Sequence, residues 1–372
     1  MVRVSEDTHT SNETTLPTRL DEILRQTSRS VYLTLRVAPA PLRRQLMLAY
    51  LFCRAADTIA DTHVLPPVVR VEILEIYRGQ FGEGDPDLGA LGPVRELAER
   101  TTGDGFSAGE KALLSELDAC FAIYCELEPR DRELFCKLLR TLTVGMAMDL
   151  ETFPKEEEAQ LDGRVVAFES LADLDRYCYH VAGCVGEFWT DLHVHHVRDF
   201  SSLDRDTMVD LGVRFGKGLQ MTNVLRDLPA DLRIGRCYLP REVLQPAGVE
   251  PSELVHALEV SDPGALQDLE SRMRAVLDGL LDQTIDHFNA GWKYTLSIPR
   301  RLVRSRLACC WPLLIGLETL ALLRHEKRKL LAGQRLKMTR GQVYGLIAAS
   351  SMRCWSNRAL DALYRRLEAK AS

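Results

Sequence analysis

Residues 220–240 read QMTNVLRDLPADLRIGRCYLP, and this stretch decides the fold prediction for the 372-residue chain. Asn223, Asp227 and Asp231 stand four residues apart in it, so a helix would place all three on one face. An amide carbonyl and two carboxylates form a set of hard oxygen donors that suits Mg²⁺. Pro229 lies between the two aspartates and removes one helical hydrogen bond, so we expect the helix to end or bend there.

A second acidic stripe occurs far upstream, in the segment YLFCRAADTIAD. Its Tyr50, Arg54, Asp57 and Asp61 share one helical face because they stand at i, i+4, i+7 and i+11. Two carboxylates one turn apart repel each other by a few tenths of a kcal/mol, and a hard cation between them reverses that preference. A solvated helix face is the alternative, but the apolar flanking residues make unpaired carboxylates unfavourable here.

The two stripes together predict more than either stripe alone. If they face each other across a helical domain, they could hold several Mg²⁺ ions and one or two diphosphates. Arg54, Arg226 and Arg236 lie close to the stripes and supply forked donors that fit phosphate oxygens. Metal ions and arginines would then stabilise a departing pyrophosphate.

The rest of the chain predicts helices in a single all-α domain over residues 19–372, behind a disordered polar tail at residues 1–18. Strand signals are nearly absent. Gly79–Gly92 and Gly103–Gly109 are expected to be loops. The helical patterns are Arg43–Thr62, Glu110–Cys125, Arg130–Glu151, Leu171–Leu192, Asp204–Leu228 and Pro263–Ala290.

Composition excludes several classes of protein. Hydrophobic residues make up 46% and charged residues 27%, which is ordinary for a globular chain and unlike a collagen-like or wholly disordered one. The net charge of −6 argues against a general nucleic-acid binder, which needs a basic surface. The ten cysteines form no CxxC pair and are expected to be reduced thiols. The N-terminus lacks the apolar stretch of a signal peptide, so we expect a cytoplasmic protein.

One segment, Leu307–Leu323, is apolar enough to raise the question of a membrane. Pro312 and Glu318 interrupt it, and a span needs about 20 apolar residues, so a buried core helix is the better interpretation. The basic run Arg324–Lys329 follows. It is expected to be a solvated turn, and peripheral contact with an anionic membrane is the second interpretation.

The chain resembles the squalene and phytoene synthase family of head-to-head prenyltransferases over roughly Thr27–Leu346. The resemblance rests on SRS at 28–30, on YLFCRAADTIAD, on YCYHVAGCVG at 177–186 and on residues 220–240. Chain-elongating prenyl synthases instead carry DDxxD motifs, and here Ala56 precedes Asp57.

The resemblance implies an all-α isoprenoid synthase fold around an apolar cavity. It also implies Mg²⁺-dependent condensation of two prenyl diphosphates through a cyclopropyl intermediate. The implied metal ligands are Asp57, Asp61, Asn223, Asp227 and Asp231. The implied diphosphate-binding or ligand-orienting residues are Ser28, Arg29, Tyr50, Arg54, Gln220, Arg226 and Arg236. Tyr177 would lie near the reacting carbons and help to move a proton, although from the residues alone a core side chain is the better interpretation.

The resemblance leans towards squalene synthases, which reduce the intermediate with NADPH. LKMTRGQVYGLI at 336–347 resembles their C-terminal segment, in which Lys337 and Arg340 would contact the phosphates of NADPH. No GxGxxG motif follows a strand. Val31 and Ala308 stand where the family often has aromatic residues. Phytoene, dehydrosqualene or hydroxysqualene synthesis without reduction therefore stays an alternative, and the substrate is expected to be farnesyl rather than geranylgeranyl diphosphate.

Weaker signals leave further alternatives. The small residues of two segments, Ala182, Gly183 and Gly186 in one and Gly212, Gly216 and Gly218 in the other, either make room for an apolar ligand or allow tight helix packing. His193, His195 and His196 could bind zinc, but their spacing favours a surface cluster. Rival functions are a helical Mg²⁺-dependent nucleotide phosphohydrolase and an inactive partner subunit. The oligomeric state stays open.

Overall fold

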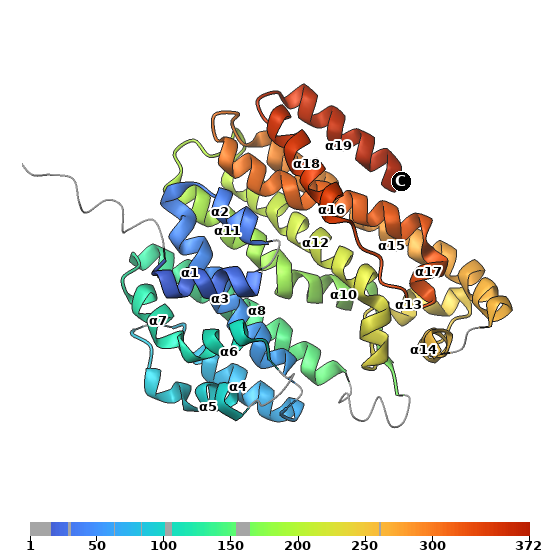
Figure 1. Cartoon of the computed structure of the whole chain (residues 1–372), viewed down its shortest axis with the longest axis horizontal. Coiled ribbons are helices and arrows are strands. Elements are labelled where there is room, and N and C mark those ends of the chain that lie inside the picture. Colours follow the sequence, from blue (N-terminus) through green and yellow to red (C-terminus); the bar gives the residue numbers. More distant parts are fainter. Residues whose placement is uncertain are drawn as a thin grey trace, which may run out of the picture.

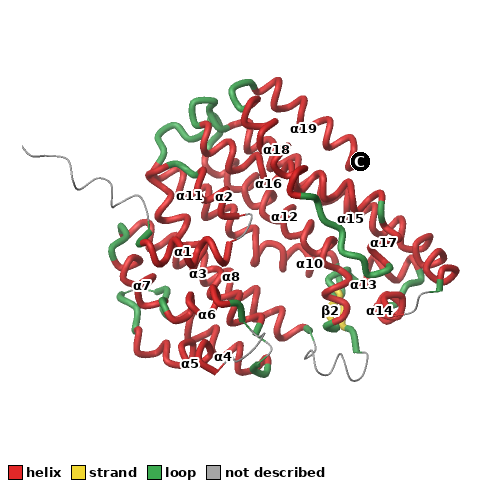
Figure 2. Tube along the Cα trace, in the orientation of Figure 1, coloured by secondary structure: helices red, strands yellow, loops and turns green. Residues whose placement is uncertain are grey.

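The computed structural model describes residues 16–28, 31–62, 64–82, 84–100, 106–153, 164–259 and 262–372. These residues are helical almost throughout (Figure 1; Figure 2). Among them the only strands are β1 (Val166–Ala167) and β2 (Arg236–Cys237), which pair in parallel, Val166 with Arg236. The all-α prediction is confirmed.

Most helices of the first half lie at one end of the molecule and most of the second half at the other (Figure 1). The first half comprises α1 (Thr18–Ser28), α2 (Val31–Val37), α3 (Ala40–Asp61), α4 (Pro67–Gly79), η1 (Leu88–Leu91), α5 (Gly92–Arg100), α6 (Ala108–Ser115), α7 (Leu117–Cys125) and α8 (Pro129–Thr152). The second comprises α10 (Leu171–Cys178), the π turn η2 (Tyr179–Gly183), α11 (Cys184–His196), α12 (Arg205–Arg233), α13 (Arg241–Leu244), η3 (Gln245–Ala247), α14 (Pro251–Glu259), α15 (Pro263–Ser297), α16 (Val303–His325), α17 (Lys327–Leu331), α18 (Arg340–Arg353) and α19 (Asn357–Ala371). Of these, α11 lies beside α2 and packs on the first-half helices α3 and α8 (Figure 1).

Local sequence signals explain where many helices begin. Pro67, Pro129 and Pro263 occupy the first position of α4, α8 and α15, where the missing N–H would have had no partner. Reciprocal capping boxes start α6, α10 and α18, pairing Ser107 with Glu110, Ser170 with Asp173, and Thr339 with Gln342.

The predicted helices are present, with two divisions that the periodicity did not show. The Glu110–Cys125 pattern breaks at Glu116 into α6 and α7. The Leu171–Leu192 pattern is divided by the π turn η2, which separates α10 from α11. Of the predicted tail, residues 1–15 lie outside the described part of the chain, while Leu16 is buried and α1 begins at Thr18.

The loop predictions need two adjustments. The Gly79–Gly92 segment contains the short helix η1. In the Gly103–Gly109 segment, Ala108 already begins α6, and the first residues lie outside the described ranges.

Buried apolar residues form two main clusters. The first is built by the first-half helices together with α11, and the second is built by α10, α12, α15, α16 and α19. The helix α16 belongs to the second cluster. It is the one described helix that is long and apolar enough to cross a membrane, and 72% of its most apolar window is buried inside the protein. The structure therefore agrees with a core helix.

Glycines let α12 approach α11 and η2 very closely. A Cβ at Gly186 would lie 1.9 Å from the carbonyl oxygen of Gly212, and a Cβ at Gly216 would lie 2.2 Å from that of Ala182. No side chain larger than hydrogen fits at these two crossings. Of the two interpretations of these small residues, tight helix packing is the one that the structure supports here.

Candidate active site

The two acidic stripes lie at the ends of α3 and α12. Asp57 and Asp61 occupy the last turns of α3, and Asn223 and Asp231 belong to the last turns of α12. The helix continues through Pro229 to Arg233, so the expected end of the helix at the proline is wrong. Helical spacing therefore holds across the whole second stripe.

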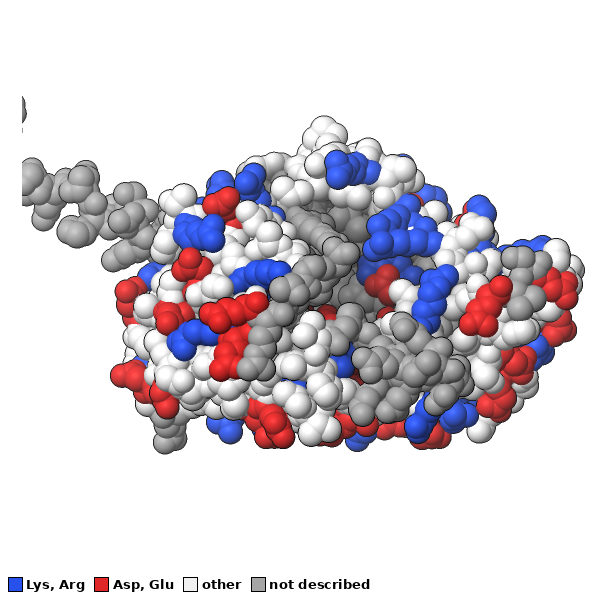
Figure 3. All heavy atoms as spheres, turned by 60° about the horizontal axis from the view of Figure 1, so that its bottom comes forward, with Lys and Arg blue, Asp and Glu red and all other residues white. Residues whose placement is uncertain are grey.

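The two stripes come close together at one end of each helix. Burial, followed by the charge of Asp227, raises the pKa of Asp231 to about 7, and the charges of Asp149 and Asp61 add to the rise. Asp61 belongs to α3 and Asp231 to α12, so the ends of these helices lie within electrostatic range. Figure 3 shows a hollowed face on which acidic and basic side chains meet.

A carboxyl group of the first stripe has a raised pKa for the same reasons. Burial and the neighbouring charge of Asp61 raise the pKa of Asp57 to about 7, and the Arg54 guanidinium opposes this rise. The Asp57 side chain is nevertheless 44% exposed to water. Protein atoms therefore surround this carboxyl group on most sides, while water still reaches it.

Arginines accompany each stripe. On α3, Arg54 pairs with Glu110 of α6, and its Nη1 lies 3.7 Å from Oδ2 of Asp57. On α12, Arg226 donates two hydrogen bonds to the carboxylate of its neighbour Asp227. One of them runs from Nε to Oδ1 over 3.0 Å. These arginines hold positive charge beside the carboxylates, where phosphate oxygens could replace their present partners.

The remaining predicted diphosphate-binding residues are divided between two places. On α12, the Gln220 Oε1 accepts from Asn223 Nδ2 at 3.3 Å. At the end of α1, the Tyr50 hydroxyl donates to the carbonyl oxygen of Thr27 at 3.1 Å, and the buried Ser28 donates to that of Leu24 at 2.5 Å. Arg29, the other residue of this group, lies outside the described residues.

Asp149 of α8 belongs to the same site, although sequence reasoning missed it. It is buried and accepts from Arg236 Nη1 at 2.6 Å and from the Tyr238 hydroxyl at 2.7 Å. Burial raises its pKa, and the Arg236 guanidinium opposes the rise. The sequence did contain one sign of this role. Asp149 stands near the end of the apolar Arg130–Glu151 pattern, and a carboxylate that is buried there needs a positively charged or hydrogen-bonding partner.

An aromatic cluster borders this charged group. Tyr177 stacks on Tyr238 with ring centroids 5.0 Å apart, and Phe168 and Phe153 complete the cluster. All four rings are buried. Since Tyr238 also donates to Asp149, one contact chain links Tyr177 to the buried ion pair. Burial and the neighbouring Tyr238 raise the pKa of Tyr177 far above its ordinary value, so its hydroxyl keeps its proton.

The residues predicted to contact NADPH lie elsewhere on the chain. Lys337 is exposed on the connection between α17 and α18, and Arg340 is exposed at the first position of α18. Neither makes an ion pair with another described residue. Of the two departures from the family pattern, Val31 is exposed and Ala308 is buried.

The carboxylates fit a group of divalent cations. Burial, followed by the charge of a neighbouring carboxylate, raises the pKa of Asp57 and of Asp231, and a bound cation would relieve that crowding. The predicted ligands offer only carboxylate and amide oxygens, as Mg²⁺ prefers.

In metal-free protein, the raised pKa of Asp231 should make the free energy of unfolding depend on pH. The unfolded Asp231 carboxyl ionises near its ordinary value of 3.8, whereas the folded one keeps its proton to about pH 7. Between these values the folded state binds more protons, so this group lowers the free energy of unfolding as the pH rises. In EDTA, the free energy of unfolding of Asp231→Asn minus that of wild type should therefore increase as the pH is raised from about 5 to about 7.5. Urea titrations at the two pH values measure this difference.

The matched control removes an exposed carboxylate from the same helix. Asp210→Asn should stay within about 0.5 kcal/mol of wild type at both pH values. If the free energy of unfolding of Asp231→Asn differed from that of wild type by the same amount at both pH values, the raised pKa of Asp231 would be contradicted.

Comparison with known proteins now adds to this geometry. Residues 24–342 match the family model described as squalene/phytoene synthase. A presqualene diphosphate synthase from Zymomonas mobilis is 33% identical over 236 residues, covering 63% of each chain. A squalene synthase from Eremothecium gossypii is 31% identical over 229 residues, covering 60% of this chain and 46% of the relative. Matched regions thus span about half to two thirds of these relatives.

Solved structures agree on the fold. A structure of TcSQS in complex with the ligand E5700 superposes with a TM-score of 0.69 at 18% identity, covering 95% of this chain and 96% of the other. A dehydrosqualene synthase in complex with a ligand superposes with a TM-score of 0.56 at 18% identity, covering 94% and 95%. The predicted isoprenoid synthase fold is confirmed, and the chain belongs to the squalene/phytoene synthase family.

Proposed function

We propose that the protein joins two farnesyl diphosphates head to head through the cyclopropyl intermediate presqualene diphosphate and then reduces this intermediate with NADPH to squalene. The observation that carries the proposal is the pair of acidic stripes near the ends of α3 and α12, which lie close enough together that the charge of Asp61 on α3 adds to the raised pKa of Asp231 on α12. Family membership favours prenyl transfer over nucleotide hydrolysis. An inactive partner subunit would have no use for a complete set of carboxylates.

In this proposal the acidic residues prepare the site for diphosphate. Asp57, Asp61, Asn223, Asp227 and Asp231 would hold Mg²⁺, with Asp149 fixing the nearby Arg236 rather than serving as a ligand. Bound Mg²⁺ supplies positive charge that stabilises a departing pyrophosphate. Arg54 and Arg226 would turn from their carboxylate partners towards phosphate oxygens, since a guanidinium binds either anion through two parallel hydrogen bonds.

The aromatic cluster would serve the carbon chemistry. A carbocation is destroyed by water, and the faces of Tyr177, Tyr238, Phe153 and Phe168 offer a dry surface. Each aromatic face within reach of a cation stabilises it by about 0.5–2 kcal/mol. Because Tyr238 is tied to Asp149, the stack that holds Tyr177 is fixed in place. Tyr177 would then present its hydroxyl proton towards the reacting carbons and the leaving group.

The reductive step rests on Lys337 and Arg340. Both are exposed and without an ion-pair partner among the described residues, so both are available to a phosphate group. The competing proposal is that the reaction stops at presqualene diphosphate. It is favoured by relatives of that name, of which one from Rhodopseudomonas palustris is 28% identical and covers 74% of this chain and 77% of its own length.

A single series of incubations separates these outcomes. Purified protein receives farnesyl diphosphate and Mg²⁺, with and without NADPH, and the apolar extract and the remaining diphosphates are identified by mass spectrometry. We expect presqualene diphosphate without NADPH and squalene when NADPH is present. Geranylgeranyl diphosphate in a parallel set tests the chain length.

Other products would revise specific parts of the proposal. Presqualene diphosphate as the final product in both arms removes the reductive step, and dehydrosqualene or hydroxysqualene independent of NADPH replaces it. No coupled product from either prenyl diphosphate contradicts the proposed condensation itself.

A further inference from the structure

A cluster of metal-binding side chains lies far from the acidic stripes. Asp131 occupies the first turn of α8, whereas Asp149 lies near its other end. Eighteen residues separate them, which is about 27 Å along a helix. The partners of Asp131 are His195 and His196, the last two residues of α11. The cluster is therefore spatially separate from the proposed active site.

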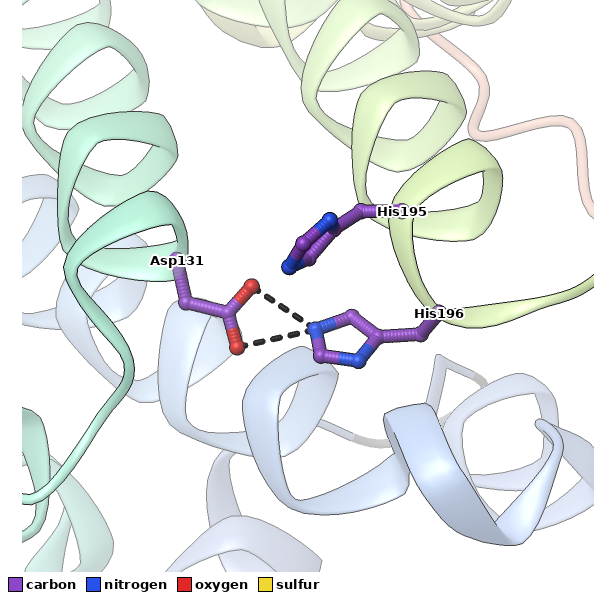
Figure 4. A group of neighbouring side chains, drawn as sticks. All are labelled: Asp131, His195 and His196. Carbon is purple, nitrogen blue, oxygen red and sulfur yellow. Dashed lines mark hydrogen bonds and ion pairs between the residues drawn. The ribbon is translucent and has the colours of Figure 1, made fainter.

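Three donor groups converge at this point (Figure 4). The His196 Nε2 lies 2.8 Å from Oδ1 and 3.0 Å from Oδ2 of Asp131. One donor atom from each of Asp131, His195 and His196 lies within 4.8 Å of the others. The Asp131 side chain is 1% exposed, His196 is 17% exposed and His195 is 36% exposed. The carboxylate is thus the buried member of the cluster, and the two imidazoles are its more exposed members.

The separations suit a tetrahedral ion. Zinc bonds of about 2.0–2.1 Å place neighbouring donor atoms about 3.3 Å apart in a tetrahedron. The His196 and Asp131 donor atoms lie 2.8 Å apart and no pair in the group is more than 4.8 Å apart, so small side-chain rotations suffice. Two imidazoles and one carboxylate are typical zinc ligands and differ from the all-oxygen set of the acidic stripes.

A simple hydrogen bond does not account for the whole arrangement. The buried Asp131 carboxylate needs a partner, and His196 together with Gln45 Nε2 at 3.3 Å already provides one. His195 is nevertheless turned to the same place, and its Nε2 lies 3.5 Å from Oε2 of Glu128, the residue that precedes α8. Two imidazoles therefore converge on a carboxylate that one imidazole and Gln45 already satisfy, and Glu128 lies beside the outer imidazole as a further carboxylate.

The histidine motif thus separates into two parts. His193 is fully buried between Trp189 and Phe200, with ring centroids 4.5 Å and 4.6 Å away, so the expectation of a surface cluster is wrong for this residue. Its Nδ1 lies 2.8 Å from the Trp189 carbonyl oxygen. Adjacent residues on a helix normally diverge. Here the rings of His195 and His196 nevertheless lie close together, with centroids 4.6 Å apart, and the third ligand comes from α8 rather than from the motif.

We propose that Asp131, His195 and His196 bind one Zn²⁺ ion, with Glu128 or a water molecule as the fourth ligand. The ion joins the start of α8 to the end of α11. It binds the folded state and not the unfolded chain, because the ligands come from two helices, and so it stabilises the protein in proportion to its occupancy. The site carries no part of the prenyl chemistry.

The test is zinc titration of the full-length protein after removal of metal with EDTA. Excess MgCl₂ occupies the oxygen-rich stripes while ZnCl₂ is added in a calorimeter, and the melting temperature is recorded in parallel. We expect one zinc ion per chain and a raised melting temperature. His196→Ala and His195→Ala should each weaken zinc binding by at least about 100-fold. The Asp227→Asn variant should bind zinc as wild type does.

The matched control is His256→Ala, which removes an exposed histidine on α14 and should leave zinc binding unchanged. His195→Ala is the variant that spares the His196–Asp131 hydrogen bond, so its fold in EDTA should equal that of wild type. Cobalt provides an independent readout, because tetrahedral Co²⁺ gives intense visible bands that His195→Ala should abolish. Wild-type protein that binds no zinc, or variants that bind it equally well, would overturn the proposal.

Discussion

Asp227→Asn should reduce the turnover of farnesyl diphosphate by about 10²–10³-fold or more while the protein stays folded. The substitution keeps the shape of the side chain and removes the charge that would hold a metal ion at the second stripe. It also removes the acceptor charge that Arg226 now grips with two hydrogen bonds. Asp57→Asn should have an effect of the same size on the first stripe. Rates are measured as coupled product formed in single-turnover and steady-state assays.

Stability distinguishes a lost metal ligand from a damaged fold. Burial and then the charge of Asp61 disfavour the ionised form of Asp57, so Asp57→Asn should not lower the melting temperature of metal-free protein. Asp210→Asn, on the exposed side of α12, serves as the control and should keep full activity. Full activity in Asp227→Asn or Asp57→Asn would contradict the assignment of these carboxylates as metal ligands.

Gly186→Ala should lower the free energy of unfolding by about 3 kcal/mol or more. A methyl group at this position would lie 1.9 Å from the carbonyl oxygen of Gly212, and that oxygen belongs to the backbone of α12 and cannot rotate away. The two helices must therefore separate. Urea titrations at fixed pH give the change, and we expect activity to fall with it because α12 carries the second stripe.

Gly279→Ala is the matched control, because this glycine lies inside α15 with no atom within 4 Å of the added methyl group. It should raise the free energy of unfolding by about 0.5–1 kcal/mol, since alanine is the better helix former. If Gly186→Ala were as stable as wild type, the close crossing of α11 and α12 would be wrong.

The helices could be predicted from sequence because their signals are local. Apolar periodicity gave α3, α8, α12 and α15, and the prolines and capping residues mark several of their starts. Pro229 does not end the helix, contrary to one of the two expected outcomes, because a proline in a long helix removes only a single hydrogen bond. The buried faces of Leu225, Leu228 and Leu232 hold the helix together on both sides of that gap. Tertiary packing, which sequence spacing does not record, decided the outcome.

The candidate site divides in the same way. The regular spacing of Asp57, Asp61, Asn223 and Asp227 made them visible as stripes, because residues of one helix face repeat at known intervals. Asp149 was not visible, since its partners Arg236 and Tyr238 are nearly ninety residues away and only the fold brings them together. The same holds for Asp131, which the histidine motif could not reveal without the position of α8.

The glycine crossings have a consequence for how the enzyme would lose its activity. One acidic stripe belongs to a helix packed in the first apolar cluster, and the other belongs to a helix packed in the second. Neither cluster alone contains a complete site. A transient opening along the line where they meet would separate the two halves of the active centre while most of each core survived. Inactivation should therefore precede melting, and amide protons near Gly186 and Gly216 should exchange with solvent on the timescale of that loss.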